Sequence, residues 1–156
     1  MDFARCFFTR QPFDDEIRKK LFSLSVPVEE LADVLLDFLE RERGMDKAAT
    51  AELRELIGLA AKLYDASDKA EYANYLSHPL RVAASFAWCF RQVSRDELVL
   101  ALWHNAIELG VIDKIGRARL GDWVCRRIAT LTIDRAKEKE PAYLKAYYDA
   151  IVASGE

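Results

Sequence analysis

The chain has 156 residues, of which 51% are hydrophobic and 31% charged, with six glycines and four prolines. This length supports one domain with a real core, and so few helix-breaking residues favour long helices. The formal net charge of −3 excludes the basic surface of a typical nucleic-acid-binding protein, although a local Lys/Arg cluster could still hold a phosphate.

The cysteines and the apolar runs indicate in which cellular compartment the protein is expected. Cys6, Cys89 and Cys125 are odd in number and widely spaced, which argues against a disulfide framework or a zinc knuckle. The N-terminus has no signal-peptide pattern, and the longest apolar run, residues 98–103, is far shorter than the ~20 residues of a membrane span. We therefore expect a soluble protein with no membrane partner, in a reducing compartment, most simply the cytoplasm.

The N-terminal part of the chain predicts three amphipathic helices, over residues 12–24, 27–43 and 47–64. In each of them apolar residues recur at three- and four-residue steps. Gly44 lies just past the end of the second helix, and Asp46 is a plausible N-cap for the third. These helices are expected to be packing elements with one solvated face.

Two further helices carry the polar residues of interest. Ser77 is a candidate N-cap for a fourth helix that ends near residue 90. Ser94 and Glu97, three residues apart, form a capping box for a fifth helix over residues 95–109. Since this fifth helix is apolar nearly all round in its middle part, we expect it to be the central, most buried element.

The remaining chain predicts two more helices, over residues 120–131 and from Pro141 onward, after a connection rich in Lys and Arg. No segment has the alternation of a strand, and there is no internal repeat. The sequence therefore predicts an all-α fold of about seven helices. Residues 1–44 are expected to form a helical extension packed against a helical domain of residues 45–156, as one compact unit.

The only two histidines, His78 and His104, each lie in a run that otherwise predicts buried helix. Histidines on consecutive core helices can converge on one point, and a metal ion is the usual reason. On a helix, His104 and Glu108 would share a face, with Asn105 beside them. These buried polar groups need partners, which either a hydrogen-bond network or a metal-and-water site would supply. His78 could instead be a surface or capping residue at a helix start.

Residues 75–83 read YLSHPLRVA and residues 102–109 read LWHNAIEL. These two motifs resemble the HD superfamily of metal-dependent phosphohydrolases. They are similar to the pattern Y-x-x-H-P-x-x-V-A followed by L-x-H-D-x-x-E-D of the ppGpp hydrolase (RelA/SpoT-type) branch. The resemblance covers roughly residues 53–151. It implies an HD-like helical bundle in which His78 and His104 bind a divalent ion such as Mn²⁺, and Glu108 helps to position or activate the attacking water.

The sequence departs from the family pattern at three acidic positions. Asn105 replaces the aspartate that names the motif, so its amide oxygen can touch a metal but supplies no negative charge. Leu109 replaces the second acid of the E-D pair. The last family ligand has no clear match, because Asp149 comes too early, and that ligand could lie beyond Glu156. A metal at His78, His104 and Asn105 is therefore expected to be weakly held or absent.

Two functions remain open from the sequence. The first is a degenerate HD-domain protein, non-catalytic or weakly active, that binds a small phosphorylated ligand or a protein partner. The alternative is an active metal-dependent phosphohydrolase acting on a nucleotide or a (p)ppGpp-like phosphoester. The aromatic last helix, with Tyr143, Tyr147 and Tyr148, could also present an apolar face to a second copy, which makes a homodimer possible.

Overall fold

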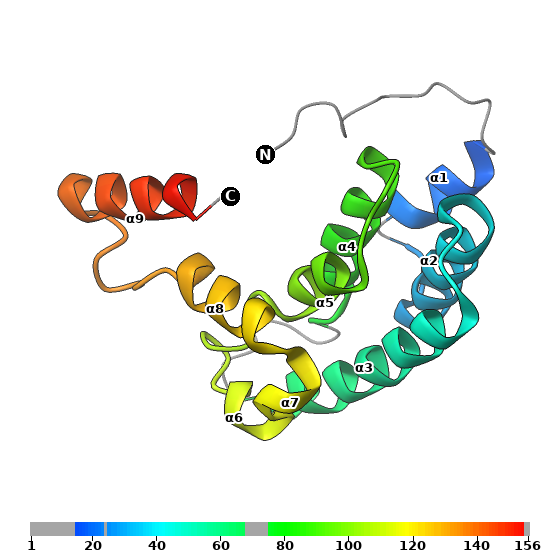
Figure 1. Cartoon of the computed structure of the whole chain (residues 1–156), viewed down its shortest axis with the longest axis horizontal. Helices are drawn as coiled ribbons and strands as arrows, with labels where there is room; N and C mark the ends of the chain where they lie inside the picture. Colours follow the sequence, from blue (N-terminus) through cyan, green and yellow to red (C-terminus); the bar gives the residue numbers. More distant parts are fainter. Residues whose placement is uncertain (1–14, 24, 68–74, 155–156) are drawn as a thin grey trace.

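The computed structural model describes residues 15–23, 25–67 and 75–154, and within them the fold is all-α, with no strand. Residues 12–14 and 24 of the first predicted helix lie outside the described residues, as do Cys6 and Glu156. The described helices, shown in Figure 1, are α1 (Asp15–Phe22), α2 (Val28–Arg43), α3 (Lys47–Asp65), α4 (Ser77–Cys89), α5 (Arg95–Trp103), α6 (Ile112–Ile115), α7 (Arg117–Leu120), α8 (Asp122–Leu131) and α9 (Pro141–Ala153).

Several predicted helix ends are confirmed. Gly44 follows α2 with a φ of 64°, a left-handed conformation that glycine adopts without steric cost. The Asp46 carboxylate accepts a hydrogen bond of 2.8 Å from the Ala49 amide at the start of α3. At α5 the Ser94 hydroxyl accepts from the Glu97 amide, and the Glu97 carboxylate accepts from the Ser94 amide at 2.7 Å. The predicted capping box is therefore present.

The prediction for Ser77 is wrong. The N-cap of α4 is Leu76, which makes no side-chain cap bond, and Ser77 is already the first helical residue. Leu76 has helical dihedrals (φ −55°, ψ −23°), and the His78 amide donates to the Tyr75 carbonyl. Because this turn before the helix already has helical backbone, Ser77 does not have the extended conformation that an N-cap needs.

The predicted end of the fifth helix is also wrong. α5 ends at Trp103, and residues 104–110 form turns. Within them, the Ala106 amide donates to Trp103 and the Gly110 amide to Ile107, which are three-residue steps, whereas the Leu109 amide makes a four-residue step to Asn105. Gly110 has a φ of 68°, and the amide that follows it returns to the Ala106 carbonyl. Gly110 therefore ends this segment as expected, but the residues before it are not α-helical.

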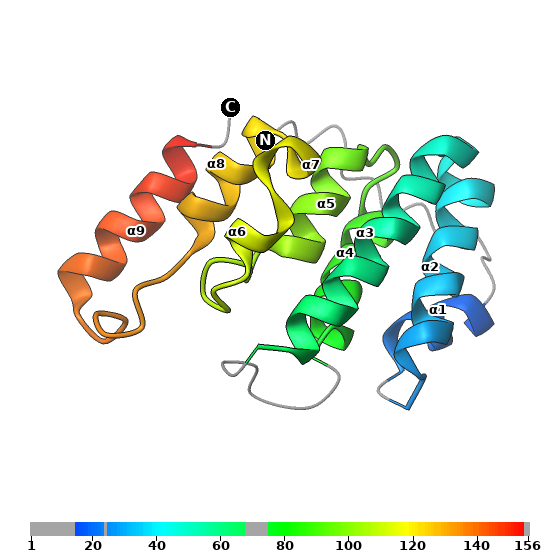
Figure 2. The same cartoon turned by 90° about the horizontal axis from the view of Figure 1, so that it is seen from below.

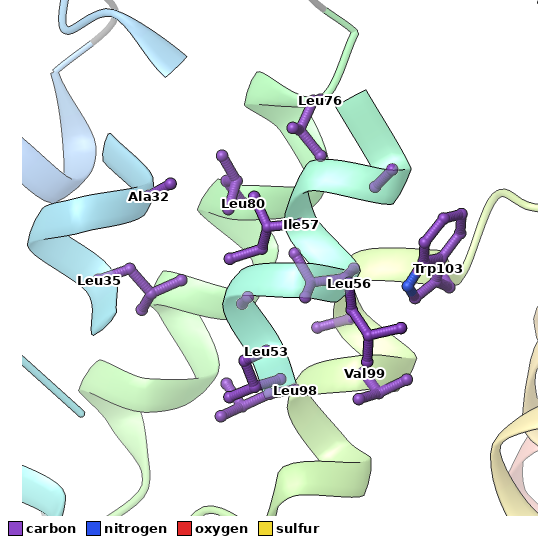
Figure 3. Packing of buried hydrophobic residues seen from close by; sticks show 14 of the residues in the cluster. Ala32, Leu35, Leu53, Leu56, Ile57, Leu76, Leu80, Leu98, Val99 and Trp103 are labelled. Atoms are coloured by element: carbon purple, nitrogen blue, oxygen red, sulfur yellow. The ribbon is translucent and has the colours of Figure 1, made fainter. Parts of the chain in front are cut away.

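The core lies between the N-terminal helices and α8. α4 and α5 pack against each other, α2 and α3 cover one side of this pair, and α8 contacts α5 on the other (Figures 1 and 2). Side chains from four helices meet there, as Figure 3 shows for Leu35 of α2, Leu53 of α3, Leu80 of α4, and Leu98 and Trp103 of α5. Thus α2, although it belongs to the predicted extension, shares the core with the later helices.

The C-terminal region departs most from a compact bundle. The basic connection after Gly110 contains the two single-turn helices α6 and α7, which raises the number of helices above the predicted seven. α9 begins at Pro141 as predicted but lies at one end of the molecule, with α8 as its main contact (Figure 2). Among the helices of the described residues, none combines the length and apolar character needed to cross a bilayer.

Candidate functional site

The structure brings the two histidines into contact. His78 lies in the first turn of α4, His104 follows directly after α5, and the packing of these two helices places the imidazoles side by side. The His78 Nε2 and His104 Nε2 atoms are 3.2 Å apart, and the ring planes are inclined by 68°. The convergence expected from the sequence is therefore present in the fold.

The hydrogen bonds of His104 fix its tautomer. Its Nδ1 lies 2.7 Å from the Ala101 carbonyl oxygen. A carbonyl oxygen only accepts, so Nδ1 carries the proton, and in the neutral ring Nε2 has a lone pair. The N–H between the two rings then belongs to His78. Histidines that bind metals show the same arrangement, because a backbone carbonyl that accepts from one ring nitrogen directs the other toward the ion.

The distance between the two Nε2 atoms fits two ligands of one ion. Nitrogens that bind one ion at about 2.1 Å with tetrahedral or octahedral angles lie roughly 3.0–3.4 Å apart. The observed 3.2 Å falls in that range, and it also suits the hydrogen bond that the metal-free pair makes. The imidazole pair therefore fits an ion that prefers nitrogen ligands, such as Zn²⁺, Ni²⁺ or Cu²⁺.

Asn105 belongs to a network with Tyr75. Its Nδ2 donates to the Tyr75 hydroxyl at 2.7 Å, and the Tyr75 ring has an edge contact with the His78 ring, with 6.2 Å between their centroids. Tyr75 thus connects the segment after α5 with the start of α4. The sequence predicts no role for Tyr75 beyond its place in the motif, three residues before His78.

Glu108 has its polar partners in the segment after α8. Its Oε2 lies 3.1 Å from Arg135 Nη2, and its Oε1 accepts from the Ile133 amide at 3.5 Å. Arg135 also binds Glu138, and hydrogen bonds to Glu138 and then to Glu108 raise the pKa of the guanidinium. His104 and Glu108 do not lie on one α-helix as expected, because α5 ends before both.

The site offers few further metal ligands. In residues 15–23, 25–67 and 75–154, no three side chains of His, Cys, Asp or Glu are grouped so that they could hold an ion. Asp149 of α9 is paired with Lys145 at 2.6 Å. Two imidazoles without a carboxylate fit poorly with Mn²⁺, which prefers oxygen ligands. Among the residues that the structure describes, the side chains here fit a two-nitrogen site and do not form the carboxylate-containing set of a hydrolytic HD centre.

Comparison with known proteins gives no relative. No family model matches the sequence, and neither a curated protein nor a solved structure matches the chain. The resemblance to the HD superfamily consequently depends on the sequence motifs, chiefly the two that contain the histidines.

Proposed function

We propose that this chain is a degenerate HD-domain protein that binds a ligand or a protein partner at the His78–His104 pair without hydrolysing a phosphoester. The observation that carries the proposal is the ion pair between Glu108 and Arg135, because it engages the only carboxylate that the resemblance assigns to catalysis. We further propose that the protein belongs to a reducing compartment, most simply the cytoplasm, as the odd number and wide spacing of the cysteines predict.

Hydrolysis at a metal centre requires a firmly held ion with an open position for water. Asn105 contributes no negative charge to such an ion, and its amide nitrogen is engaged by Tyr75. The charge of Glu108 is balanced by Arg135. An ion on the two imidazoles alone would therefore be weakly bound, with its remaining positions open to an anionic group such as the phosphate of a small ligand.

The alternative function, an active metal-dependent phosphohydrolase, is favoured by one observation. The 3.2 Å separation of the two Nε2 atoms, with His104 Nδ1 held by the Ala101 carbonyl, is a ligand geometry that needs little rearrangement. On this alternative, substrate binding would have to supply the missing oxygen ligands.

Metal content and turnover separate the two functions. The purified protein is incubated with Mn²⁺ or with Zn²⁺, desalted and analysed by mass spectrometry, beside a His78→Ala variant as matched control. We expect substoichiometric Zn²⁺ that His78→Ala abolishes, little Mn²⁺, and no release of product from ppGpp or a nucleotide phosphoester. Near-stoichiometric Mn²⁺ together with hydrolysis would contradict the proposal and establish the alternative.

A further inference from the structure

A second concave site lies between α6, α7 and α8, and it shares no residue with the histidine pair. It is a pocket of about 350 Å³, which is within the range of small-molecule sites, roughly 300–1,000 Å³. Its apolar lining consists of Ile107, Ile112, Cys125 and Ala129. We call it the α6–α8 pocket. Such a lining favours the burial of an aromatic or aliphatic group.

The charged residues of the pocket give it a positive balance. Arg117 and Arg126 line it together with a single acid, Asp113. Residues 112–130, which surround it, contain five Lys or Arg and two Asp, in a chain whose net charge is −3. This segment therefore creates a local positive potential on an acidic protein, and that potential attracts anions.

Both guanidiniums are available to a ligand. Arg117 pairs with Asp122 only at 3.8 Å, and the two side chains are 74% and 76% exposed, so this contact contributes little. In the part of the chain that the structure describes, no carboxylate forms an ion pair with Arg126. A guanidinium binds a carboxylate through two parallel hydrogen bonds, which adds directionality to the charge attraction.

We propose that the α6–α8 pocket binds a small carboxylic acid whose apolar body occupies the lining and whose carboxylate meets Arg117 and Arg126. The balance of two guanidiniums and one carboxylate in the lining is +1, which matches a monoanion. A phosphate monoester carries about −1.5 to −2 at neutral pH and would bring this extra charge close to Asp113. The pocket thus selects for one negative charge beside an apolar group.

Three probes with the same ring system but different charges test which ligand charge the α6–α8 pocket prefers. Calorimetric titrations of the full chain, with EDTA present to keep the histidine pair free of metal, use 2-naphthoate, 2-naphthol and 2-naphthyl phosphate. We expect 2-naphthoate to bind about tenfold more tightly than neutral 2-naphthol, because one charge-assisted hydrogen bond contributes about that difference in affinity. We also expect 2-naphthoate to bind at least as tightly as 2-naphthyl phosphate. Equal affinity for 2-naphthol, tighter binding of the phosphate, or no binding of 2-naphthoate at about 5 mM would each overturn the assignment.

Two variants locate the binding in this pocket. Arg126→Gln removes one guanidinium and should weaken 2-naphthoate about tenfold, while leaving 2-naphthol unchanged. Ala129→Leu fills the lining and should abolish binding of both probes. Arg54→Gln at the α2–α3 surface and Ala142→Leu on α9 are the matched controls, and both should bind as the wild type does. Ala129 and Arg126 are exposed, so both variants should fold. Unchanged affinity in either would refute the site.

Discussion

At the scale of single residues, the histidine pair depends on groups around it that are fixed by hydrogen bonds. The Ala101 carbonyl sets the tautomer of His104, and Tyr75 holds Asn105. One layer deeper, the Tyr64 hydroxyl donates to the Leu102 carbonyl at 2.7 Å, just before the point where α5 ends. The ring of Tyr64 packs edge-on against Trp103 and Tyr75. Tyr64 therefore supports the segment that presents His104.

Changing Asn105 to Asp tests whether the site has lost only its charge. The Tyr75 hydroxyl can donate as well as accept, so an aspartate at this position can keep the hydrogen bond with its direction reversed. We expect Asn105→Asp to change the free energy of unfolding by about 1 kcal/mol or less. The added negative charge should raise the affinity for Zn²⁺ or Mn²⁺ by about tenfold or more.

Urea denaturation and metal titration of Asn105→Asp measure these two quantities, with Asn105→Ala as the control that removes the hydrogen bond. A large loss of stability without a gain in metal affinity would mean that Asn105 serves only the hydrogen-bond network.

Tyr64 should make the protein sensitive to alkali. Burial raises the pKa of the Tyr64 phenol well above its ordinary value, and the neighbouring Tyr75 adds to the shift. The folded chain keeps this proton to higher pH than the unfolded chain does, so the stabilisation is complete below pH ~10 and decreases as pH rises above it. Urea titrations between pH 8 and pH 11 should show this loss.

A Tyr64→Phe variant is the control for this pH dependence. It should be about 1 kcal/mol less stable at neutral pH, because the Leu102 carbonyl loses its partner. Its alkaline loss of stability should be clearly smaller than that of the wild type. An equal loss in both proteins would show that other groups cause the pH dependence.

At the scale of secondary-structure elements, Glu108 lies in the segment that follows α5 and contacts residues after α8. Residues 104–110 form turns after α5, and Glu108 in this segment contacts Ile133 and Arg135 in the connection between α8 and α9. The same connection is held by the Tyr147 hydroxyl, which donates to the Leu131 carbonyl at 2.7 Å, and by the Tyr143 hydroxyl, which accepts from the Asp134 amide. Glu108 thus helps to position α9.

Removing the Glu108 carboxylate should loosen this connection more than it destabilises the whole fold. Arg135 is 66% exposed, so we expect Glu108→Gln to lower the unfolding free energy by no more than about 1 kcal/mol. Amide hydrogen exchange should nevertheless become faster at Ile133 and along α9. Lys145→Gln, which breaks only the pair with Asp149 inside α9, is the control and should leave Ile133 unchanged. Unchanged exchange in Glu108→Gln would contradict this positioning role.

At the scale of the whole molecule, α9 is the least buried of the longer helices that the structure describes. None of its residues is buried, although only Lys145 and Asp149 among its thirteen residues are charged. Tyr148 and Val152 are 59% and 79% exposed. An apolar helix at one end of the chain, with α8 as its main contact, is typical of a surface that another protein covers (Figure 1).

We expect a second copy of the chain to cover α9, as a symmetric dimer in which the two helices pack together. Sedimentation at micromolar concentration should then give a dimer. The double change Tyr148→Lys and Val152→Lys should give a monomer, because it places charges in the contact. Phe22→Lys, an exposed apolar position at the opposite end, is the matched control and should remain dimeric. A wild-type monomer would remove this expectation.

The sequence by itself determined the features that depend on neighbours a few residues away. The helix class, the Asp46 cap, the Ser94–Glu97 capping box and the left-handed Gly44 were all predictable, because each involves contacts within one or two turns. Even the meeting of the two histidines could be anticipated, since their helices are consecutive and both are apolar. Whether that meeting binds a metal remains a prediction.

Only the tertiary structure decided which polar groups surround the histidines. The bond between Asn105 and Tyr75 and the ion pair between Glu108 and Arg135 join residues 30 and 27 positions apart. The hydrophobic periodicity predicted that the fifth helix extends to residue 109, whereas α5 ends at Trp103. Periodicity reports which residues are apolar, and it does not show where the backbone hydrogen bonds of a helix stop. The sequence also showed no sign that the Glu108 carboxylate would pair with Arg135, because that contact depends on how the segment after α8 packs.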